Sequence, residues 1–181
     1  MRTKARKEQG AKCPPGGEGL LRLYYACLEN ARVLLEEAEL LLKPGSAARA
    51  FALAFTAYEE IGKSQVVADF YNDQVAESEF ASAFRLHHLK LAYLERVVRL
   101  SAGTLLEGTI EYDVRKLNPL TGRRNDALYV NYVNGFEPRS PADAITRDQA
   151  QEMIDAGYEE LESIARAEEL NGRIGSKGLF K

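Results

Sequence analysis

The chain has 181 residues and a formal net charge of −3, and 45% of its residues are hydrophobic. A chain of this size buries a core without disulfides or a structural metal, so we expect one folded domain. Its two ends are basic, with +3 on residues 1–19 and +3 on residues 172–181, which leaves about −9 between them. This acidic body argues against general coating of nucleic acid, but a local basic patch remains open.

Cysteine usage and hydropathy indicate the compartment. Cys13 and Cys27 form no C-x-x-C pair, and the chain shows no signal-peptide pattern. Two separate thiols are typical of a reducing cytosol rather than of a disulfide scaffold. The longest apolar run, in residues 50–58, is far too short to span a bilayer. We therefore expect a soluble cytoplasmic protein with no membrane partner.

The domain boundaries follow from composition. Residues 1–19 are rich in charge, Gly and Pro, which predicts a disordered basic tail. Helical periodicity predicts a folded domain over residues 20–171, and residues 172–181 are expected to form a flexible C-terminal tail.

Two long helices open the predicted domain. Apolar residues recur at three- and four-residue steps from Leu20, and Pro44-Gly45 ends this first helix. Ser46 can cap the second helix, which covers about 47–71. This helix is apolar on nearly every side from Ala50 to Tyr58, so we expect it in the middle of a bundle.

A third helix is predicted over about 77–101. Its apolar seam has alternating four- and three-residue steps and consists of Phe80, Phe84, His87, Leu91, Leu94 and Val98. The stretch FRLHHLKL lies in its middle and holds both histidines of the chain. On this helix His87 faces the buried seam, whereas His88 lies about 100° further round.

The pattern weakens after Gly103, and residues 113–139 carry several turn signals, which predicts a long irregular loop. Within it, ALYVNYV is aromatic and β-branched and is expected to be extended. Thr146 and Gln149 form a capping-box pattern for a last helix, which Asn171-Gly172 closes. The predicted fold class is all-α: an antiparallel bundle of four main helices with a long loop before the last one.

Charged residues of the second helix are the first candidates for a site. Glu59 and Lys63 are spaced i, i+4 and can pair on the surface, an interaction of about 0.3–0.5 kcal/mol. Glu60 continues the line of Leu53 and Ala57, so its carboxylate is expected to point inward. A buried carboxylate needs a partner, and a basic residue of the third helix is the candidate.

That candidate is Lys90, which shares a helix face with His87 near the expected position of Glu60. Such an acid, imidazole and ammonium can form a structural network or can serve proton transfer, and the residues alone do not distinguish the two. Adjacent His87 and His88 cannot both face one ion, and no Glu-x-x-His pair is present. We expect neither a metal nor a cofactor.

The predicted loop adds a basic element. Four cations lie within ten residues, followed by two tyrosines: Arg115, Lys116, Arg123, Arg124, Tyr129 and Tyr132. Such residues offer phosphate contacts together with stacking surfaces. A solvated loop that simply needs charge is the alternative.

Four segments occur in an order and spacing that resemble the AbiV-type abortive-infection proteins, a branch of the HEPN superfamily. They are ENARVLLEEAELLL, RAFALAFTAYEEIGKSQ, FRLHHLKL and RNDALYVNY, and the similarity covers about residues 21–135. The resemblance implies an antiparallel helical bundle, usually dimeric, that belongs to bacterial phage defence. In the wider superfamily many members cut RNA without a metal, whereas others bind nucleotides or partners.

The family motifs map onto individual residues. The family's Glu-Glu-x-Gly-Lys block is matched by Glu60, Gly62 and Lys63. Its His-Lys-x-Lys block is matched by His87 and Lys90, with His88 in place of a lysine. Its Arg…Leu-Tyr-Val-Asp block is matched by Arg124 and Tyr129, with Asn131 in place of the aspartate. We therefore predict a catalytic set of His87, Lys90, Arg124, Glu60, Lys63 and Tyr129. A phosphate-binding set is predicted at Arg85, His88, Arg115, Lys116, Arg123 and Asn125.

One departure from the superfamily separates two functional hypotheses. Catalytic HEPN proteins carry a histidine after the Arg-polar pair, but Tyr129 stands there in this chain. A phenol with an ordinary pKa near 10 is a poor acid–base group at neutral pH. The first hypothesis is an AbiV-like antiviral effector or toxin that acts on RNA or the translation machinery, as a metal-independent ribonuclease. The alternative is a non-catalytic dimeric module that sequesters a partner protein or nucleotide.

The resemblance also implies partners. We expect RNA or a ribosome-associated target, a phage-encoded activator or neutralising partner, and a second copy of the chain in a homodimer.

Overall fold

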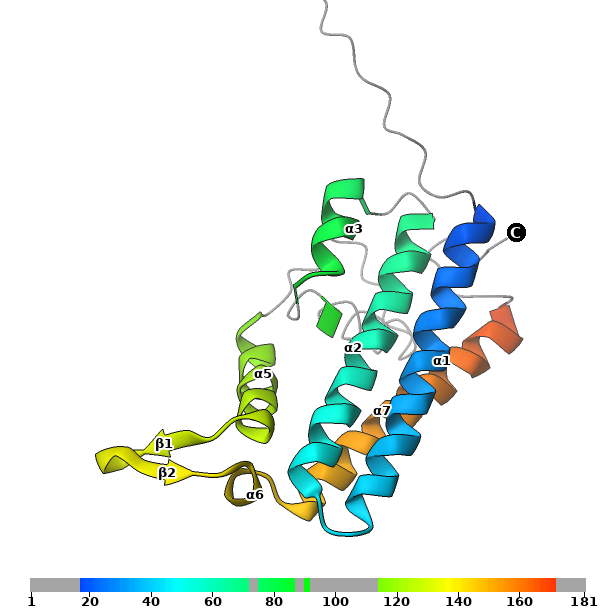
Figure 1. Cartoon of the computed structure of the whole chain (residues 1–181). Coiled ribbons are helices and arrows are strands. Elements are labelled where there is room, and N and C mark those ends of the chain that lie inside the picture. The colour runs from blue at the N-terminus through cyan, green and yellow to red at the C-terminus, as the bar shows by residue number, and fades with distance from the viewer. Residues whose placement is uncertain (1–16, 72–74, 87–89, 92–113, 172–181) are drawn as a thin grey trace, which may run out of the picture.

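Long helices form the body of the molecule (Figure 1): α1 (Gly17–Leu42), α2 (Ala47–Tyr71) and α7 (Arg147–Asn171). The computed structural model describes residues 17–71, 75–86, 90–91 and 114–171. α1 and α2 run antiparallel, side by side, and α7 crosses behind both of them. The predicted all-α bundle is confirmed. No helix in these ranges combines the length and the hydropathy needed to cross a membrane.

The turn between α1 and α2 forms where the sequence predicts it. The Gly45 N–H donates to the carbonyl of Leu42 at 3.1 Å, and the Ser46 N–H donates to that of Leu41 at 3.0 Å. Gly45 has a φ of +90°, which glycine adopts without the steric cost that other residues meet. These two bonds satisfy carbonyls left free at the end of α1, as in a Schellman motif.

α2 occupies the centre of the bundle, as its apolar pattern predicts. It contacts α1, α7, α5 and α3, and most of its side chains are buried. Phe51, Phe55 and Ile61 are among the largest fully buried side chains. A helix buried on nearly every side must place any polar residue it carries next to a partner.

The start of α7 is determined by local chemistry. The Gln149 N–H donates to Thr146 Oγ1 at 3.2 Å, and the Thr146 N–H donates to Gln149 Oε1 at 2.9 Å. The predicted capping box is therefore confirmed. Arg147 also donates to the carbonyl of Leu42 at 2.7 Å, which attaches the start of α7 to the end of α1.

The predicted third helix is wrong in its continuity. α3 (Glu77–Ala83) ends at its C-cap Phe84, and Arg85 lies in a turn. Helical structure is seen again at Lys90 and Leu91, whereas residues 87–89 and 92–113 lie outside the described residues. The apolar spacing gave no sign of the turn, because periodicity records which positions are buried and not whether the helix between them is continuous.

The predicted irregular loop is shorter than expected. α5 (Val114–Leu128) is helical through Pro119 and Gly122, which the local turn signals placed in a loop. Leu120, Ala127 and Leu128 pack on the core from one helix face, and this tertiary contact outweighs the local signals.

The chain leaves the α-helix only from Tyr129. β1 (Asn131–Val133) pairs with β2 (Glu137–Arg139) as an antiparallel hairpin around a 3₁₀ turn (Asn134–Phe136). The extended structure predicted for ALYVNYV is thus confined to its last three residues. The short helix α6 (Pro141–Ala144) leads from the hairpin into α7.

Gly62 allows the backbone of Lys90 to lie directly against α2. A Cβ atom at position 62 would stand 2.2 Å from the carbonyl oxygen of Lys90 and 2.8 Å from its carbonyl carbon. Since these are backbone atoms, a side chain cannot be accommodated by a rotamer change. The glycine of the EEIGK stretch is therefore required for packing.

Replacing Gly62 with Ala should destabilise the protein. The new methyl group must push residue 90 away from α2, and overpacking of this kind costs about 1–3 kcal/mol. Gly122→Ala is the matched control, because a Cβ at this helical position of α5 meets nothing within 4 Å. It should be stabilising by about 0.5–1 kcal/mol. Urea unfolding of both variants tests this, and equal stability of the two would contradict the packing argument.

Candidate functional site: a charged cluster on α2

One stripe of α2 faces residue 90 and α5. Phe55, Glu59 and Gly62 follow one another at four- and three-residue steps and therefore share a helix face. Glu59 Oε2 lies 3.8 Å from Lys90 Nζ, and the two side chains are only 5% and 7% exposed. The guanidinium carbon of Arg124 lies 5.9 Å from the centre of the Phe55 ring. The stripe thus brings together an acid of α2, the lysine of residue 90 and an arginine of α5.

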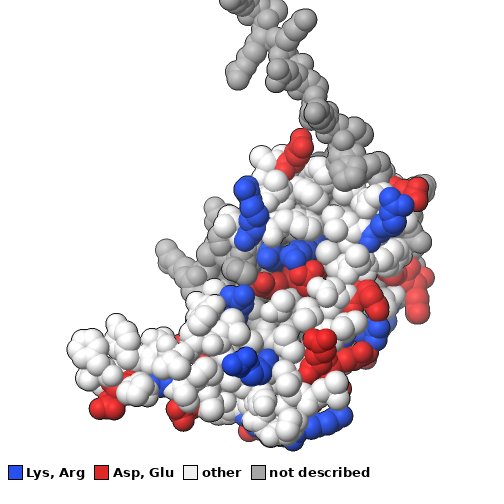
Figure 2. All heavy atoms as spheres, viewed as in Figure 1, with Lys and Arg blue, Asp and Glu red and all other residues white. Residues whose placement is uncertain are grey.

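A second ion pair adjoins the first. Lys63 Nζ bonds Glu60 Oε1 within α2, and both side chains are largely covered. Lys63 also lies 5.9 Å from the centre of the Phe84 ring, at the end of α3. These five ionisable residues are named the charged cluster: Glu59, Glu60, Lys63, Lys90 and Arg124. Figure 2 shows acidic and basic atoms side by side near the middle of this face of the molecule.

Burial changes the proton affinity of Lys90. Loss of solvent around its amine lowers the pKa, and the nearby carboxylate of Glu59 opposes this shift. Lys63 and Arg124 lower the pKa further, while Glu60 raises it, so all five groups interact electrostatically. Burial also raises the pKa of the Cys27 thiol of α1 to about 11, and Glu60 adds to this effect. Cys27 is therefore a protonated thiol at neutral pH and a poor nucleophile.

Arg124 is the member of the cluster with a free hydrogen-bond donor. Its Nε is buried and has no hydrogen-bond partner. A buried donor without a partner costs free energy, and such groups are frequent where a ligand completes the site. A guanidinium with an unused donor suits an oxyanion or a phosphate, and Arg124 also interacts electrostatically with Lys90.

The geometry can be compared with known proteins. The family model for AbiV, of the HEPN group, matches residues 19–161, which is most of the chain. The chain belongs to the AbiV family. This membership indicates an abortive-infection function of the HEPN type. Comparisons with curated proteins and with solved structures found no match.

Of the AbiV motif residues, the structure brings together Glu60, Lys63, Lys90 and Arg124, but the pairing of the two adjacent acids differs from the prediction. Glu59 is the deeper carboxylate and pairs with Lys90, whereas Glu60 pairs with Lys63. The prediction of a surface Glu59–Lys63 pair is therefore wrong. Glu60 is largely covered, but its partner is Lys63 of the same helix and not the predicted basic residue of the third helix. Because α2 is buried nearly all round, its apolar pattern gave no unique inward face from which to choose between adjacent acids.

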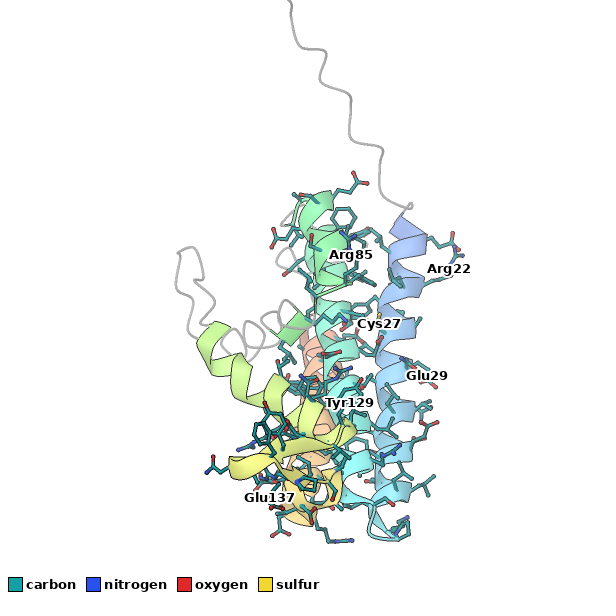
Figure 3. All side chains as sticks on the ribbon, turned by 60° about the vertical axis from the view of Figure 1, so that its left-hand side comes forward. Arg22, Cys27, Glu29, Arg85, Tyr129 and Glu137 are labelled. Carbon is teal, nitrogen blue, oxygen red and sulfur yellow. The ribbon has the colours of Figure 1, made fainter. Side chains whose placement is uncertain are left out.

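Other predicted residues do not belong to the charged cluster. Tyr129, predicted to be catalytic and labelled in Figure 3, follows the end of α5 and is 64% exposed. Tyr129 comes five residues after Arg124, and five residues of α-helix correspond to a rotation of roughly 140° about the helix axis. Arg85 is exposed, and its Nε donates to the carbonyl of Ala81 at 3.3 Å. Arg123 lines a separate groove of about 190 Å³ with Phe51 and other residues of α2, α5 and α7.

Asn125 is exposed on α5 next to Arg124, and its carbonyl accepts the Tyr129 N–H at 3.0 Å. His87, His88 and the side chains of Arg115 and Lys116 lie outside the described residues. Their proposed roles in catalysis or phosphate binding stay predictions.

Two residues of the site were not predicted to lie in it. Glu59 was assigned to the surface, and Phe55, under Arg124, was treated only as core. Phe55 and Glu59 are four residues apart, and Gly62 follows three residues later. This helical spacing is the signal that could have identified the stripe. Among the described residues, no three His, Cys, Asp or Glu side chains lie close enough together to hold a metal ion.

Glu59→Gln should lower the free energy of unfolding by about 3–5 kcal/mol, because it leaves the buried ammonium of Lys90 without its counter-charge. Glu18→Gln is the matched control, since Glu18 pairs with Arg22 on the exposed surface of α1. Its effect should be below about 1 kcal/mol. Urea unfolding at pH 7 compares the two, and a loss at Glu59 no larger than that at Glu18 would show that the buried pair is not holding the fold.

Proposed function

We propose that this AbiV-family chain is an abortive-infection effector that acts on RNA, free or within the translation machinery, through the charged cluster. The observation that carries the proposal is the unsatisfied, buried Nε of Arg124, whose guanidinium interacts electrostatically with the amine of Lys90. An arginine recognises a phosphate through a planar fork of donors, and a second cation nearby strengthens that contact.

The proposed chemistry is metal-independent cleavage of the RNA backbone. The 2′-hydroxyl attacks the adjacent phosphorus, and the bond from phosphorus to the 5′-oxygen breaks. A 2′,3′-cyclic phosphate forms, the 2′-hydroxyl loses its proton, and the leaving 5′-oxygen gains one. We assign this proton transfer to His87 and the stabilisation of the charged phosphate to Arg124 and Lys90.

The two carboxylates have supporting roles in this proposal. Glu59 holds the Lys90 amine in place, and Glu60 holds that of Lys63. Tyr129 receives no catalytic role, because it is 64% exposed and lies beyond the end of α5. The proposed mechanism therefore does not use the phenol of Tyr129, which stands in the sequence where catalytic HEPN proteins carry a histidine.

Arg124→Ala and His87→Ala should each reduce RNA cleavage by roughly 100-fold or more, the usual effect of removing one group that stabilises or protonates the transition state. Both should also relieve growth arrest in cells. Arg22→Ala is the control, because this exposed arginine of α1 pairs with Glu18 on the surface. Cleavage of a labelled RNA and growth after induction are measured for all four proteins. Equal cleavage by all of them would remove the assignment.

The alternative is a non-catalytic binding module, and the burial of the Glu59–Lys90 pair favours it. Side chains only 5% and 7% exposed are poorly placed to meet a polymer, and they can serve the fold alone. Under this alternative, variants of the cluster lose toxicity only in proportion to their loss of folded protein. Under the RNA proposal, Arg124→Ala loses toxicity while its melting temperature stays close to that of the wild type.

A further inference from the structure

A small groove lies between three helices, next to the charged cluster. Its volume is about 190 Å³. Residues of all three helices line it: Phe51 and Tyr58 of α2, Leu120 and Arg123 of α5, and Glu152 and Met153 of α7. Sites for drug-sized ligands have volumes of about 300–1,000 Å³. The groove therefore suits one flat ring system rather than a larger ligand.

The inner part of the groove is apolar. Phe51 is 2% exposed and Met153 is 6% exposed, so both side chains belong to the core as well as to the groove. Tyr58 and Leu120 are half-buried and pack against the same core. Apolar and aromatic side chains of this kind favour the flat face of a ring, and a nucleobase stacks on them whatever its identity.

Two opposite charges stand at the outer part of the groove. Arg123 of α5 and Glu152 of α7 are both exposed and line the groove from different helices. Within the described ranges, neither side chain makes a hydrogen bond or an ion pair, with the other or with a third residue. A ring that enters the groove therefore meets one cationic donor and one anionic acceptor.

Guanine is the base whose polar edges match this pair of charges. Its O6 and N7 accept two hydrogen bonds from one arginine, which is the commonest base-specific contact of that side chain. Its N1–H and N2–H₂ groups, on the adjacent edge, both donate to a single carboxylate. No other base of RNA presents two acceptors beside two donor groups in this way. The charges of the groove thus complement guanine best.

The groove continues the helix face that carries the charged cluster. Phe51 precedes Phe55 by four residues, which corresponds to roughly 6 Å along α2. Arg124 lies over the Phe55 ring, and Arg123, the residue before it on α5, lines the groove. One sugar joins the base of a nucleotide to its phosphate. A base in the groove therefore holds its own phosphate near Arg124.

We propose that the groove between α2, α5 and α7 binds a guanine base of the RNA substrate, next to the phosphate that Arg124 binds. Arg123 donates to O6 and N7, Glu152 accepts from N1 and N2, and the apolar side chains contact the ring. This inference rests on the proposed action on RNA and adds base preference to it. Contacts to phosphate carry no sequence information, whereas contacts to base edges do.

Titration calorimetry with mononucleotides tests the groove without any cleavage. The full chain should bind guanosine 3′-monophosphate about 10-fold more tightly than the adenosine, cytidine and uridine 3′-monophosphates, an effect of the size that one bidentate base contact gives. Arg123→Ala and Glu152→Gln should each remove this preference. Glu169→Gln is the matched control, because Glu169 is exposed at the opposite end of α7, and it should keep the preference. Unchanged melting temperatures establish that each variant is folded.

Three outcomes of the titrations would overturn the proposal. They are no binding of guanosine 3′-monophosphate, equal affinity for all four nucleotides, and a preference for guanine that survives both Arg123→Ala and Glu152→Gln.

Cleavage of RNA separates this inference from the proposed function. Two labelled RNAs that differ only by guanine or adenine at one position are compared, and cleavage after guanine should be about 10-fold faster. Cleavage that requires Arg124 but is equal for the two RNAs would overturn the guanine site and leave the proposed function intact. Guanine-selective binding through Arg123 and Glu152 without any cleavage would support the site and contradict the ribonuclease.

Discussion

The site depends on a close approach between a glycine of one segment and the backbone of another. Gly62 lets the carbonyl of Lys90 lie where a Cβ would otherwise be, and this approach brings the Lys90 amine to the carboxylate of Glu59, one turn earlier on α2. A buried ion pair is stable only with good geometry and further satisfied neighbours. The second pair, Glu60–Lys63, and Arg124 over Phe55 are arranged around this contact. The charged cluster therefore depends on the residue at position 62 being a glycine, which has no side chain.

α5 connects this cluster to the other unusual surface of the molecule. Arg124 faces α2 with a buried, unsatisfied Nε, and Tyr129, directly after the helix, is the first of a patch of exposed apolar residues at the β1–β2 hairpin: Tyr129, Val130, Tyr132, Val133 and Phe136. The two regions differ in chemistry: the cluster concentrates charge in a covered position, whereas the patch is apolar and flanked by balanced charges. This difference is why we propose that RNA is bound at the charged cluster and not at the hairpin.

The sequence was a good guide where the structure depends on local chemistry. The stop at Pro44-Gly45, the capping box of Thr146 and Gln149, and the central position of α2 each depend on a few neighbouring residues. Prediction from the sequence failed where tertiary contacts determine the structure. α5 is helical through Pro119 because its apolar face packs on α2, and no local signal records that contact. The choice between Glu59 and Glu60 depends on where residue 90 lies, which helical periodicity within α2 cannot reveal.

A double-mutant cycle on Glu59 and Lys90 tests the central claim most directly. Glu59→Gln, Lys90→Met and the double variant are compared with the wild type by urea unfolding at pH 7. If the two side chains form a buried pair, the double variant should be far less destabilised than the sum of the single ones, with a coupling free energy of about 1–3 kcal/mol. Additive effects within about 0.5 kcal/mol would show that the two groups do not interact, and the proposed arrangement of the site would then be wrong.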